Sequence, residues 1–343
     1  MFMSVVRVQK RKIDVVKGYA PSRVDFAGGS LDLWPIGVIL DKALTVNCAI
    51  NLYARVEARK IREKSLILTS EDYGISYEYK KGSSSGELPL LEKILDHYGV
   101  SEGWEIIVRS DFPAGSGLGG SSSISVALAK VLLEIKEQKE SPSKTVAVLR
   151  DLEAKNLGFP TGVQDFWPAI LGGILAVHYK TGQEDIESLG QVFHFLSERL
   201  IVAYTGKSHL SSETNYELYK RFLDKDKTVR KAIEGIAFAS NQLYLALKKG
   251  DFEDAGEAML EEWKNRKKLS PKISNKKMEE LEKAAIEAGA TGAKGCGAAG
   301  GGSMVFLVKL GMKRSVELAL KAKGATVLNA DAVNSGVKVE VLG

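Results

Sequence analysis

The sequence is poor in the residues that define several classes of protein. Its 343 residues include only two cysteines, Cys48 and Cys296, and four histidines, and neither cysteine belongs to a CxxC pair. Two distant cysteines without such spacing indicate neither a disulfide framework nor a zinc site. We therefore expect two free, buried thiols.

Long hydrophobic runs and a strong charge of one sign are also lacking. No run approaches the length of a membrane span, and residues 1–17 lack the apolar stretch of a signal peptide. The net charge is +5, from 48 basic and 43 acidic residues that are mostly mixed along the chain, which argues against a dedicated nucleic-acid binder. We expect a cytoplasmic globular protein that binds a small molecule and neither nucleic acid nor membrane. The oligomeric state stays open.

The charge is uneven in one place, between Lys264 and Lys277. This segment holds seven basic residues and no acidic residue. Such a run is usually a solvated face. The alternative is an anchor for an anionic substrate.

The Walker motif is absent, because no Lys-Ser or Lys-Thr pair follows a suitable glycine pattern, yet another glycine-rich segment is present. Residues 113–123 read PAGSGLGGSSS and lie between a strand-like segment, 104–108, and an apolar helical segment, 124–135. Glycines let the backbone approach a ligand, and a helix N-terminus offers unpaired N–H groups and partial positive charge. The segment is therefore a candidate nucleotide cradle, although Gly/Ser-rich stretches are also typical of flexible loops.

Two acidic residues have unusual neighbours. Asp32 lies near the end of the turn Ala27–Leu33, and Asp165 is embedded among Phe, Trp and Pro. An aspartate in the second setting is either a helix N-cap, which is the commoner fate, or a functional carboxylate in a cleft.

The pattern of apolar residues predicts an α+β protein, and the chain length predicts two domains. The expected strands are 15–20, 24–26, 43–58, 65–70, 75–80, 104–109, 174–179, 200–204, 304–309, 326–329 and 337–342. The expected helices are 88–98, 124–135, 143–157 with Ser143 as its N-cap, several between 211 and 268, 275–288 and 313–323. The charged segment 181–189 is expected to be a loop near a domain boundary, and the strand–helix–strand order at the end indicates an α+β second domain.

Three segments, in this order, resemble the signature motifs of the GHMP small-molecule kinases. They are Ala20–Arg23 with the turn Ala27–Leu33, then Pro113–Ser123, then Gly297–Gly302. The patterns Ala27-Gly-Gly-Ser-Leu-Asp32 and Gly162-Val-Gln-Asp165 are similar to those of the branch that phosphorylates sugars at the anomeric carbon. Residues 263–274 are similar to a segment typical of D-glycero-D-manno-heptose 7-phosphate kinases. The resemblance extends from residue 20 to about residue 309.

This resemblance implies a two-domain α+β fold with the active site in the cleft between the domains. An N-terminal mixed-sheet domain would span residues 1–190, and a C-terminal ferredoxin-like domain would span residues 191–343. The implied cofactors are ATP, as the phosphoryl donor, and Mg²⁺.

The resemblance also implies roles for single residues. Asp165 would take the proton of the attacking hydroxyl or orient it, and Arg23 would stabilise the transferring phosphoryl group. The ATP phosphates would be bound by Pro113, Gly115, Ser116, Gly117, Leu118, Gly119, Gly120, Ser121, Ser122 and Ser123, and Mg²⁺ by Ser121 and Glu153. The substrate would be bound by Asp32, whose carboxylate suits a vicinal diol, and by Gly28, Gly29, Ser30, Gln164, Asp165, Lys207, Ser208, Lys268, Gly300 and Gly301. Lys207, Ser208, Arg266, Lys267, Lys268 and Lys272 would be able to hold a distal phosphate.

The implied reaction is phosphorylation of an anomeric hydroxyl, most specifically that of D-glycero-D-manno-heptose 7-phosphate to give the 1,7-bisphosphate. Three departures from the family pattern leave alternatives open: Gly120 stands where Ser is usual, Ala299 where Gly is usual, and apolar Leu31 precedes Asp32. The alternatives are a free-sugar kinase resembling fucokinases or galactokinases, a kinase of a non-sugar alcohol such as the mevalonate group, and a non-catalytic sensor of sugar or nucleotide. The presence of both Arg23 and Asp165 argues against the sensor.

Overall fold

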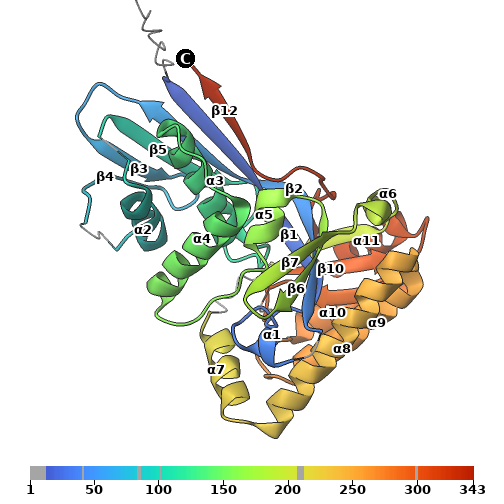
Figure 1. The fold of residues 1–343 in the computed structure, drawn as a ribbon. Helices are drawn as coiled ribbons and strands as arrows, with labels where there is room; N and C mark the ends of the chain where they lie inside the picture. Colours follow the sequence, from blue (N-terminus) through green and yellow to red (C-terminus); the bar gives the residue numbers. More distant parts are fainter. Residues whose placement is uncertain (1–12, 41, 83–85, 101, 207–211, 298–299) are drawn as a thin grey trace, which may run out of the picture.

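Two β-sheets organise the chain in the computed structural model, which describes residues 13–40, 42–82, 86–100, 102–206, 212–297 and 300–343 (Figure 1). Within these residues the first sheet has eight strands, in the order β12-β1-β2-β5-β3-β4, with β6 paired to β2 and β7 to β6. They are β1 (Val15–Ala27), β2 (Leu44–Lys60), β3 (Leu66–Ser70), β4 (Ile75–Tyr79), β5 (Trp104–Ser110), β6 (Ile174–Lys180), β7 (Gln183–Ser188) and β12 (Lys338–Leu342). The second sheet has the order β11-β8-β10-β9, from β8 (Leu200–Tyr204), β9 (Ala290–Gly295), β10 (Ser303–Val308) and β11 (Thr326–Val327).

Strand β1 is continuous through Pro21, where the sequence pattern predicts a break. It runs antiparallel to β2, and the pairing register shifts between Pro21 and Ser22. Proline has no N–H to donate and is tolerated in a sheet at such a bulge. Because the strand continues, Arg23 and Asp25 lie on it two residues apart, and both are buried. The first sheet is mixed, as predicted, because β3 and β5 are parallel whereas the other described pairs are antiparallel.

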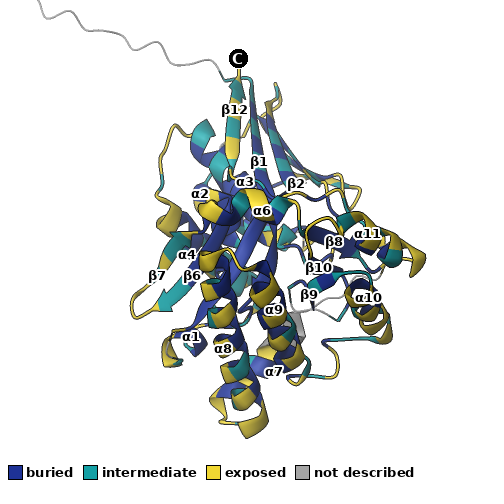
Figure 2. Ribbon diagram, turned by 90° about the vertical axis from the view of Figure 1, so that its right-hand side faces the viewer, coloured by how far each residue is buried: buried dark blue, intermediate teal, exposed yellow. Residues whose placement is uncertain are grey.

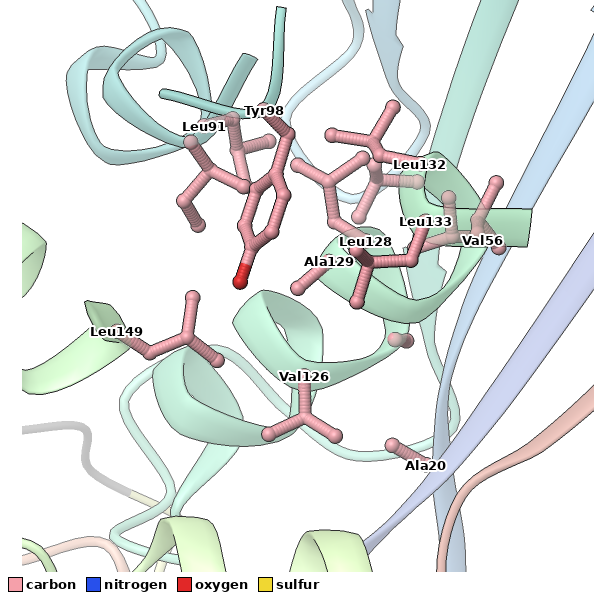
Figure 3. Close-up of a cluster of buried hydrophobic side chains, with 14 of the residues drawn as sticks. Ala20, Val56, Leu91, Tyr98, Val126, Leu128, Ala129, Leu132, Leu133 and Leu149 are labelled. Carbon is pink, nitrogen blue, oxygen red and sulfur yellow. The ribbon is translucent and has the colours of Figure 1, made fainter. Parts of the chain in front are cut away.

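A group of helices packs beside the first sheet. They are α2 (Pro89–Tyr98), α3 (Gly120–Ile135), α4 (Pro142–Leu157) and α5 (Phe166–Leu171). Figure 3 shows the side chains of α3, such as Leu128 and Leu132, between Tyr98 and Leu149 on one side and Val56 of the sheet on the other. Ten of the sixteen residues of helix α3 are buried, because these elements enclose most of its surface. Each fully buried leucine stabilises this packing by about 1.5–3 kcal/mol, so the helix that follows the glycine-rich segment is firmly held.

The second sheet has its own helices. Helices α9 (Phe252–Lys267) and α10 (Lys276–Glu287) contact β9, and α11 (Lys313–Ala322) contacts β8. Helix α8 (Lys227–Lys249) lies along α9 and also contacts β1 and β2. It therefore connects the helices of the second sheet with the first sheet. The side chains of Asp226, Asp251 and Asn275 accept backbone N–H groups at the starts of α8, α9 and α10, as favourable N-caps do. Figure 2 shows that α8 and α9 expose their outer faces and bury their inner ones.

The remaining described elements are short connections and one longer helix. They are α1 (Ile36–Ile39), the 3₁₀ turn η1 (Gly190–Val192), α6 (Phe193–Ser197) and α7 (Ser212–Leu223). No helix in the described ranges is long and apolar enough to cross a membrane.

Three predictions for the second half of the chain differ from the structure. The strand predicted at 337–342 forms as β12, but it pairs with β1 of the first sheet instead of the second sheet, where it covers an edge whose backbone groups need partners. The charged segment 181–189, predicted as a loop, contains β7, which forms a hairpin with β6 and is charged because it is an exposed sheet edge. Strand β9 is not predicted, because glycine and alanine are poor strand formers. The domain boundary between residues 190 and 191 stays a prediction. Strand β12 follows this boundary in the chain but pairs with β1, which precedes it.

Two smaller predictions concern a helix cap and the cysteines. Ser143 is not the cap of α4, because the helix begins at Pro142 and the Ser141 side chain accepts a bond from Lys144 N; proline suits the first helical position, where its missing N–H is not needed. The prediction of free, buried cysteines is confirmed. Burial raises the pKa of both the Cys48 and the Cys296 thiol, so neither is a reactive thiolate.

Candidate active site

The glycine-rich segment forms the turn that leads into α3. Gly115, Gly117 and Gly119 have φ values of 69°, 76° and 72°, a region that L side chains rarely adopt. Gly119 occupies the N-cap position of α3 and has no side chain with which to cap the helix. The first backbone N–H groups of a well-packed helix are therefore available to an anion.

The second sheet packs directly against this turn. Ser303 N donates to Ser116 O at 2.7 Å, and a Cβ on Gly117 would lie 2.7 Å from Cys296 O. A Cβ on Gly302 would lie 2.7 Å from Ser116 O. The glycine segment before β10 therefore approaches the glycine-rich turn closely at Gly302. Ala298 and Ala299 lie outside the described residues.

Arg23 and Asp165 form a two-bond ion pair beside the glycine-rich turn. Arg23 Nε and Nη2 donate to Asp165 Oδ1 and Oδ2, both at 2.7 Å, and Arg23 Nη1 donates to Gly117 O at 2.7 Å. The side chain of Arg23 is 3% exposed and that of Asp165 is 28% exposed. Burial alone would lower the pKa of Arg23, but the carboxylates of Asp165 and Asp25 raise it. Arg23 is therefore a permanent, oriented cation with its carboxylate partner open to the cavity.

The structure separates the position of Asp165 from the contacts of its side chain. It stands at the N-cap position of α5, but its side chain makes no capping hydrogen bond within the described residues. Both of its oxygens are directed to Arg23 instead. Because Phe166 and Trp167 are buried, the start of α5 is fixed, and with it the position of this carboxylate.

Asp32 lies in the same cavity, against Gly162. Asp32 Oδ2 accepts a bond from Gln164 N at 3.2 Å, and a Cβ on Gly162 would lie 1.7 Å from that oxygen, so only glycine fits there. Burial, together with the negative charge of Asp165, raises the pKa of Asp32 to about 6. Gln164 Oε1 is buried and finds no partner among the described residues. These oxygens are acceptors suited to the hydroxyl groups of a ligand.

Arg266 is held inside the protein by Glu262, one turn earlier in α9. Arg266 Nε donates to Glu262 Oε1 at 3.1 Å and Nη2 donates to the same oxygen at 2.5 Å and to Gly29 O at 2.8 Å. Gly28 N donates to Glu262 Oε1 at 3.2 Å. This buried pair therefore fixes the Gly28–Gly29 turn, and sequence reasoning missed Glu262 although its spacing of four residues from Arg266 was a signal.

The rest of the basic segment is dispersed. Lys267 Nζ pairs with Glu282 Oε2 at 3.1 Å, while Lys268 and Lys272 are exposed. Lys207 and Ser208 lie outside the described residues. The interpretation of 264–277 as a mostly solvated face therefore fits its described residues better than that of a single phosphate anchor.

Glu153 faces the start of α3. Ser121 Oγ donates to Glu153 Oε1 at 3.0 Å, and Thr161 Oγ1 donates to Glu153 Oε2 at 2.6 Å. Burial, and then the nearby charge of Asp165, raises the pKa of Glu153. A carboxylate beside a hydroxyl is the kind of hard-oxygen donor set that Mg²⁺ takes. No group of three or more His, Cys, Asp or Glu side chains in the described part of the chain is placed to hold a metal.

These groups line one cavity of about 720 Å³. Its lining includes the predicted residues Arg23, Gly29, Ser30, Asp32, Pro113, Gly115, Ser116, Gly117, Gly119, Gly120, Ser121, Ser122, Glu153, Gln164 and Asp165. The predicted residues Gly28, Leu118, Ser123, Lys268, Gly300 and Gly301 are outside this described lining. Sequence reasoning missed an apolar part of the wall next to the glycine-rich turn, formed by Leu88, Leu91, Val108, Phe112 and Ile124.

Comparison with known protein families matches one segment in each half of the chain. Residues 88–173, which include the glycine-rich turn and Asp165, match the N-terminal domain of GHMP kinases, and residues 243–326 match their C-terminal domain. The chain belongs to the GHMP kinase family. This GHMP kinase has the two-domain α+β fold that the sequence predicts, and it is an enzyme of the kinase class.

Individual relatives of the GHMP kinase are distant in sequence. It is 25% identical over 337 residues to D-glycero-alpha-D-manno-heptose 7-phosphate kinase of Campylobacter jejuni, covering 94% of this chain and 98% of the relative. It is 27% identical over 301 residues to mevalonate kinase of Pyrococcus abyssi, covering 83% of this chain and 84% of the relative. A solved structure of a D-glycero-D-manno-heptose 1-phosphate kinase from Bacteroides thetaiotaomicron superposes with a TM-score of 0.77 at 24% identity, covering 96% of this chain and 99% of that one.

Proposed function

We propose that this GHMP kinase transfers the γ-phosphoryl group of ATP to the anomeric hydroxyl of a sugar or sugar phosphate in the presence of Mg²⁺. The observation that carries the proposal is the Arg23–Asp165 pair, with both bonds at 2.7 Å, beside the glycine-rich turn and in one cavity with Asp32. The turn offers N–H donors for phosphate oxygens. Asp32 and Gln164 offer acceptors for the hydroxyls of a polyol.

In the proposed reaction, the acceptor oxygen forms a bond to the γ-phosphorus while the bond from that phosphorus to the β,γ-bridging oxygen breaks. Asp165 accepts the proton of the attacking hydroxyl, and it is suited to this role because its side chain lines the cavity and is 28% exposed. Arg23 holds Asp165 through two bonds and places positive charge beside the transferring group. Phosphoryl transfer depends chiefly on such placement and charge.

Glu153 and Ser121 are the residues that fit Mg²⁺, which when bound would neutralise charge on the β- and γ-phosphate oxygens. The bond from Thr161 Oγ1, at 2.6 Å, holds the second oxygen of Glu153. Glu153 is therefore oriented toward Ser121 before nucleotide binds.

For the acceptor, we propose D-glycero-D-manno-heptose 7-phosphate as the first candidate. The relative of that name covers nearly the whole of this chain, and Asp32 of the Ala-Gly-Gly-x-x-Asp turn lines the cavity, where its carboxylate would accept hydrogen bonds from sugar hydroxyls.

One observation favours a free sugar as the second candidate. In the described lining of the cavity the cationic side chains are Arg23 and Arg266, and each is already paired, with Asp165 and Glu262 respectively. A distal phosphate would therefore depend on residues outside that lining, such as Lys207, which is outside the described residues.

The test is ATP consumption by the purified protein with Mg²⁺ and a panel of acceptors: heptose 7-phosphate, mannose 6-phosphate, fucose, galactose and mevalonate. The position of the new phosphate is then assigned by phosphorus NMR. Turnover confined to phosphorylated sugars, with product at C1, supports the first candidate, and turnover confined to free sugars supports the second. Turnover of mevalonate alone contradicts the sugar assignment.

A further inference from the structure

A buried ion pair between Asp25 and Lys294 joins the two sheets close to Arg23. Asp25 lies on β1 and Lys294 on β9, and both side chains are 0% exposed. Lys294 Nζ donates to Asp25 Oδ2 and, at 3.1 Å, to Asp25 O. The second sheet is thus tied to the strand that carries Arg23, two residues away from that side chain.

The other oxygen of Asp25 is directed toward the active site. Asp25 Oδ1 accepts a bond from Gly297 N at 3.0 Å and lies 3.9 Å from Arg23 Nη1. A Cβ on Gly297 would lie 3.1 Å from Gly117 O, which is the carbonyl that Arg23 Nη1 bonds at 2.7 Å. The carboxylate of Asp25 therefore contacts both Arg23 and Gly297, and Arg23 in turn bonds the glycine-rich turn at Gly117.

The charges alternate along this chain of contacts, from Lys294 through Asp25 and Arg23 to Asp165. Burial alone would raise the pKa of Asp25, but the cations Lys294, Arg23 and Arg266 lower it, so Asp25 is ionised. If Lys294 lost its charge, Asp25 would compete more strongly with Asp165 for the Arg23 guanidinium, because charges in a buried site are poorly screened.

We propose that Asp25 and Lys294 are positioning residues for phosphoryl transfer, which act through Arg23 and make the Arg23–Asp165 geometry depend on docking of the second sheet. The inference rests on the proposed kinase reaction. Neither residue touches substrate in this scheme. Their effect is on the placement of groups that do, and a displacement of about 1 Å in such groups costs on the order of 10²-fold in rate.

The experiment compares Lys294→Met, Asp25→Asn and the double variant with the control Lys248→Met. Lys248 Nζ pairs with Glu187 Oε1 at 3.0 Å, so the control removes a lysine–carboxylate pair that lies outside the described lining of the cavity. We expect Lys294→Met to lower kcat by about 10²-fold, with the ATP Kd changed by less than about threefold. The double variant leaves neither member of the pair charged, so its kcat should be about tenfold higher than that of Lys294→Met. The control should keep the wild-type kcat.

A merely structural pair gives a different result. In that case the variants fold less well or melt earlier, but kcat per ATP-binding site, counted by titration, stays at the wild-type value, and this outcome overturns the proposal. Asp25→Asn keeps the side-chain volume and an acceptor for Gly297 N, so it supplies the test if Lys294→Met does not fold.

Crystal structures of the variants give a readout that does not need turnover. We expect the Arg23–Asp165 contacts to lengthen or to lose one of their two bonds. A pair that remains at 2.7 Å through both bonds in Lys294→Met and in Asp25→Asn overturns the inference even when no acceptor is known. An inactive wild-type protein with normal ATP binding counts against the proposed function instead.

Discussion

Replacing Asp165 with asparagine should remove most of the turnover and leave nucleotide binding in place. The substitution preserves side-chain volume, removes the negative charge and leaves Arg23 one oxygen acceptor where there were two. A positioned general base contributes about 10²–10⁴-fold to rate, so kcat should fall by that factor. The glycine-rich turn is untouched, so the ATP Kd should change by less than about threefold.

The cost in stability follows from the same contacts. Arg23 is 3% exposed and loses one of its two bonds to position 165, while Asp25 Oδ1 at 3.9 Å remains as a second anion. A hydrogen bond to a charged group contributes about 1.5–3 kcal/mol. At about 2 °C per kcal/mol for a chain of this size, the Tm should fall by about 3–6 °C.

A matched control is available in Asp111. Arg55 Nε and Nη2 donate to its two oxygens at 2.8 and 2.7 Å, and both side chains are 31% exposed, but Asp111 is outside the described lining of the cavity. Coupled ATP consumption gives kcat, titration calorimetry gives the ATP Kd and scanning calorimetry gives the Tm. The assignment fails if Asp165→Asn keeps more than about a tenth of the wild-type kcat, or if Asp111→Asn loses as much.

Four further results are expected. Because the pKa of Asp32 is raised to about 6 from 3.8, kcat/KM for the acceptor should fall by about tenfold per pH unit below that value, and a profile without this limb would contradict the role. The ionised form of Asp32 is disfavoured by folding, so Asp32→Asn should raise the free energy of unfolding above pH 6 by up to about 3 kcal/mol, a gain that fades between about pH 6 and 4 in urea titrations. Gly117→Ala places a Cβ 2.7 Å from Cys296 O at a φ of 76° and should weaken ATP binding at least tenfold (~1.4 kcal/mol) by calorimetry, whereas Gly158→Ala, at a φ of 78° with open space around it, should carry the same backbone strain and keep the ATP affinity. Glu153→Gln should weaken Mn²⁺ binding, followed by electron paramagnetic resonance with ADP present, by about 10–100-fold; an unchanged affinity would remove Glu153 from the metal site.

Local patterns predict much of the fold. The alternating residues of β2, the apolar run of α3 and the helical pattern of 275–288 each act over a few residues, and β2, α3 and α10 form close to where these patterns predict. Predictions fail where pairing depends on distant partners. Strand β12 forms as expected, but it pairs with β1 of the first sheet. The free edge of β1 exists only once the first sheet has folded, so the local pattern of β12 does not reveal this partner.

The candidate site divides in the same way. The glycine-rich turn and its helix are adjacent in sequence, so their chemistry is visible in the residues themselves. The roles of the basic segment are not, because charge alone does not reveal that Arg266 is neutralised by Glu262 and bonded to Gly29 O, 237 residues away. The apolar wall of the cavity is also hidden, because its leucines and valine look like ordinary core residues.

The sequence by itself determined the order of the motifs, the turn before α3 and the residue types that a phosphoryl-transfer site needs, because backbone freedom, helix polarity and side-chain chemistry are local properties. Tertiary structure alone decided which charges meet. Arg23 and Asp165 are 142 residues apart in the chain, and Asp25 and Lys294 are 269 apart. Each pair forms because strands and helices with buried faces must pack in one arrangement, and the free energy of a buried ion pair depends on contacts that only this arrangement supplies.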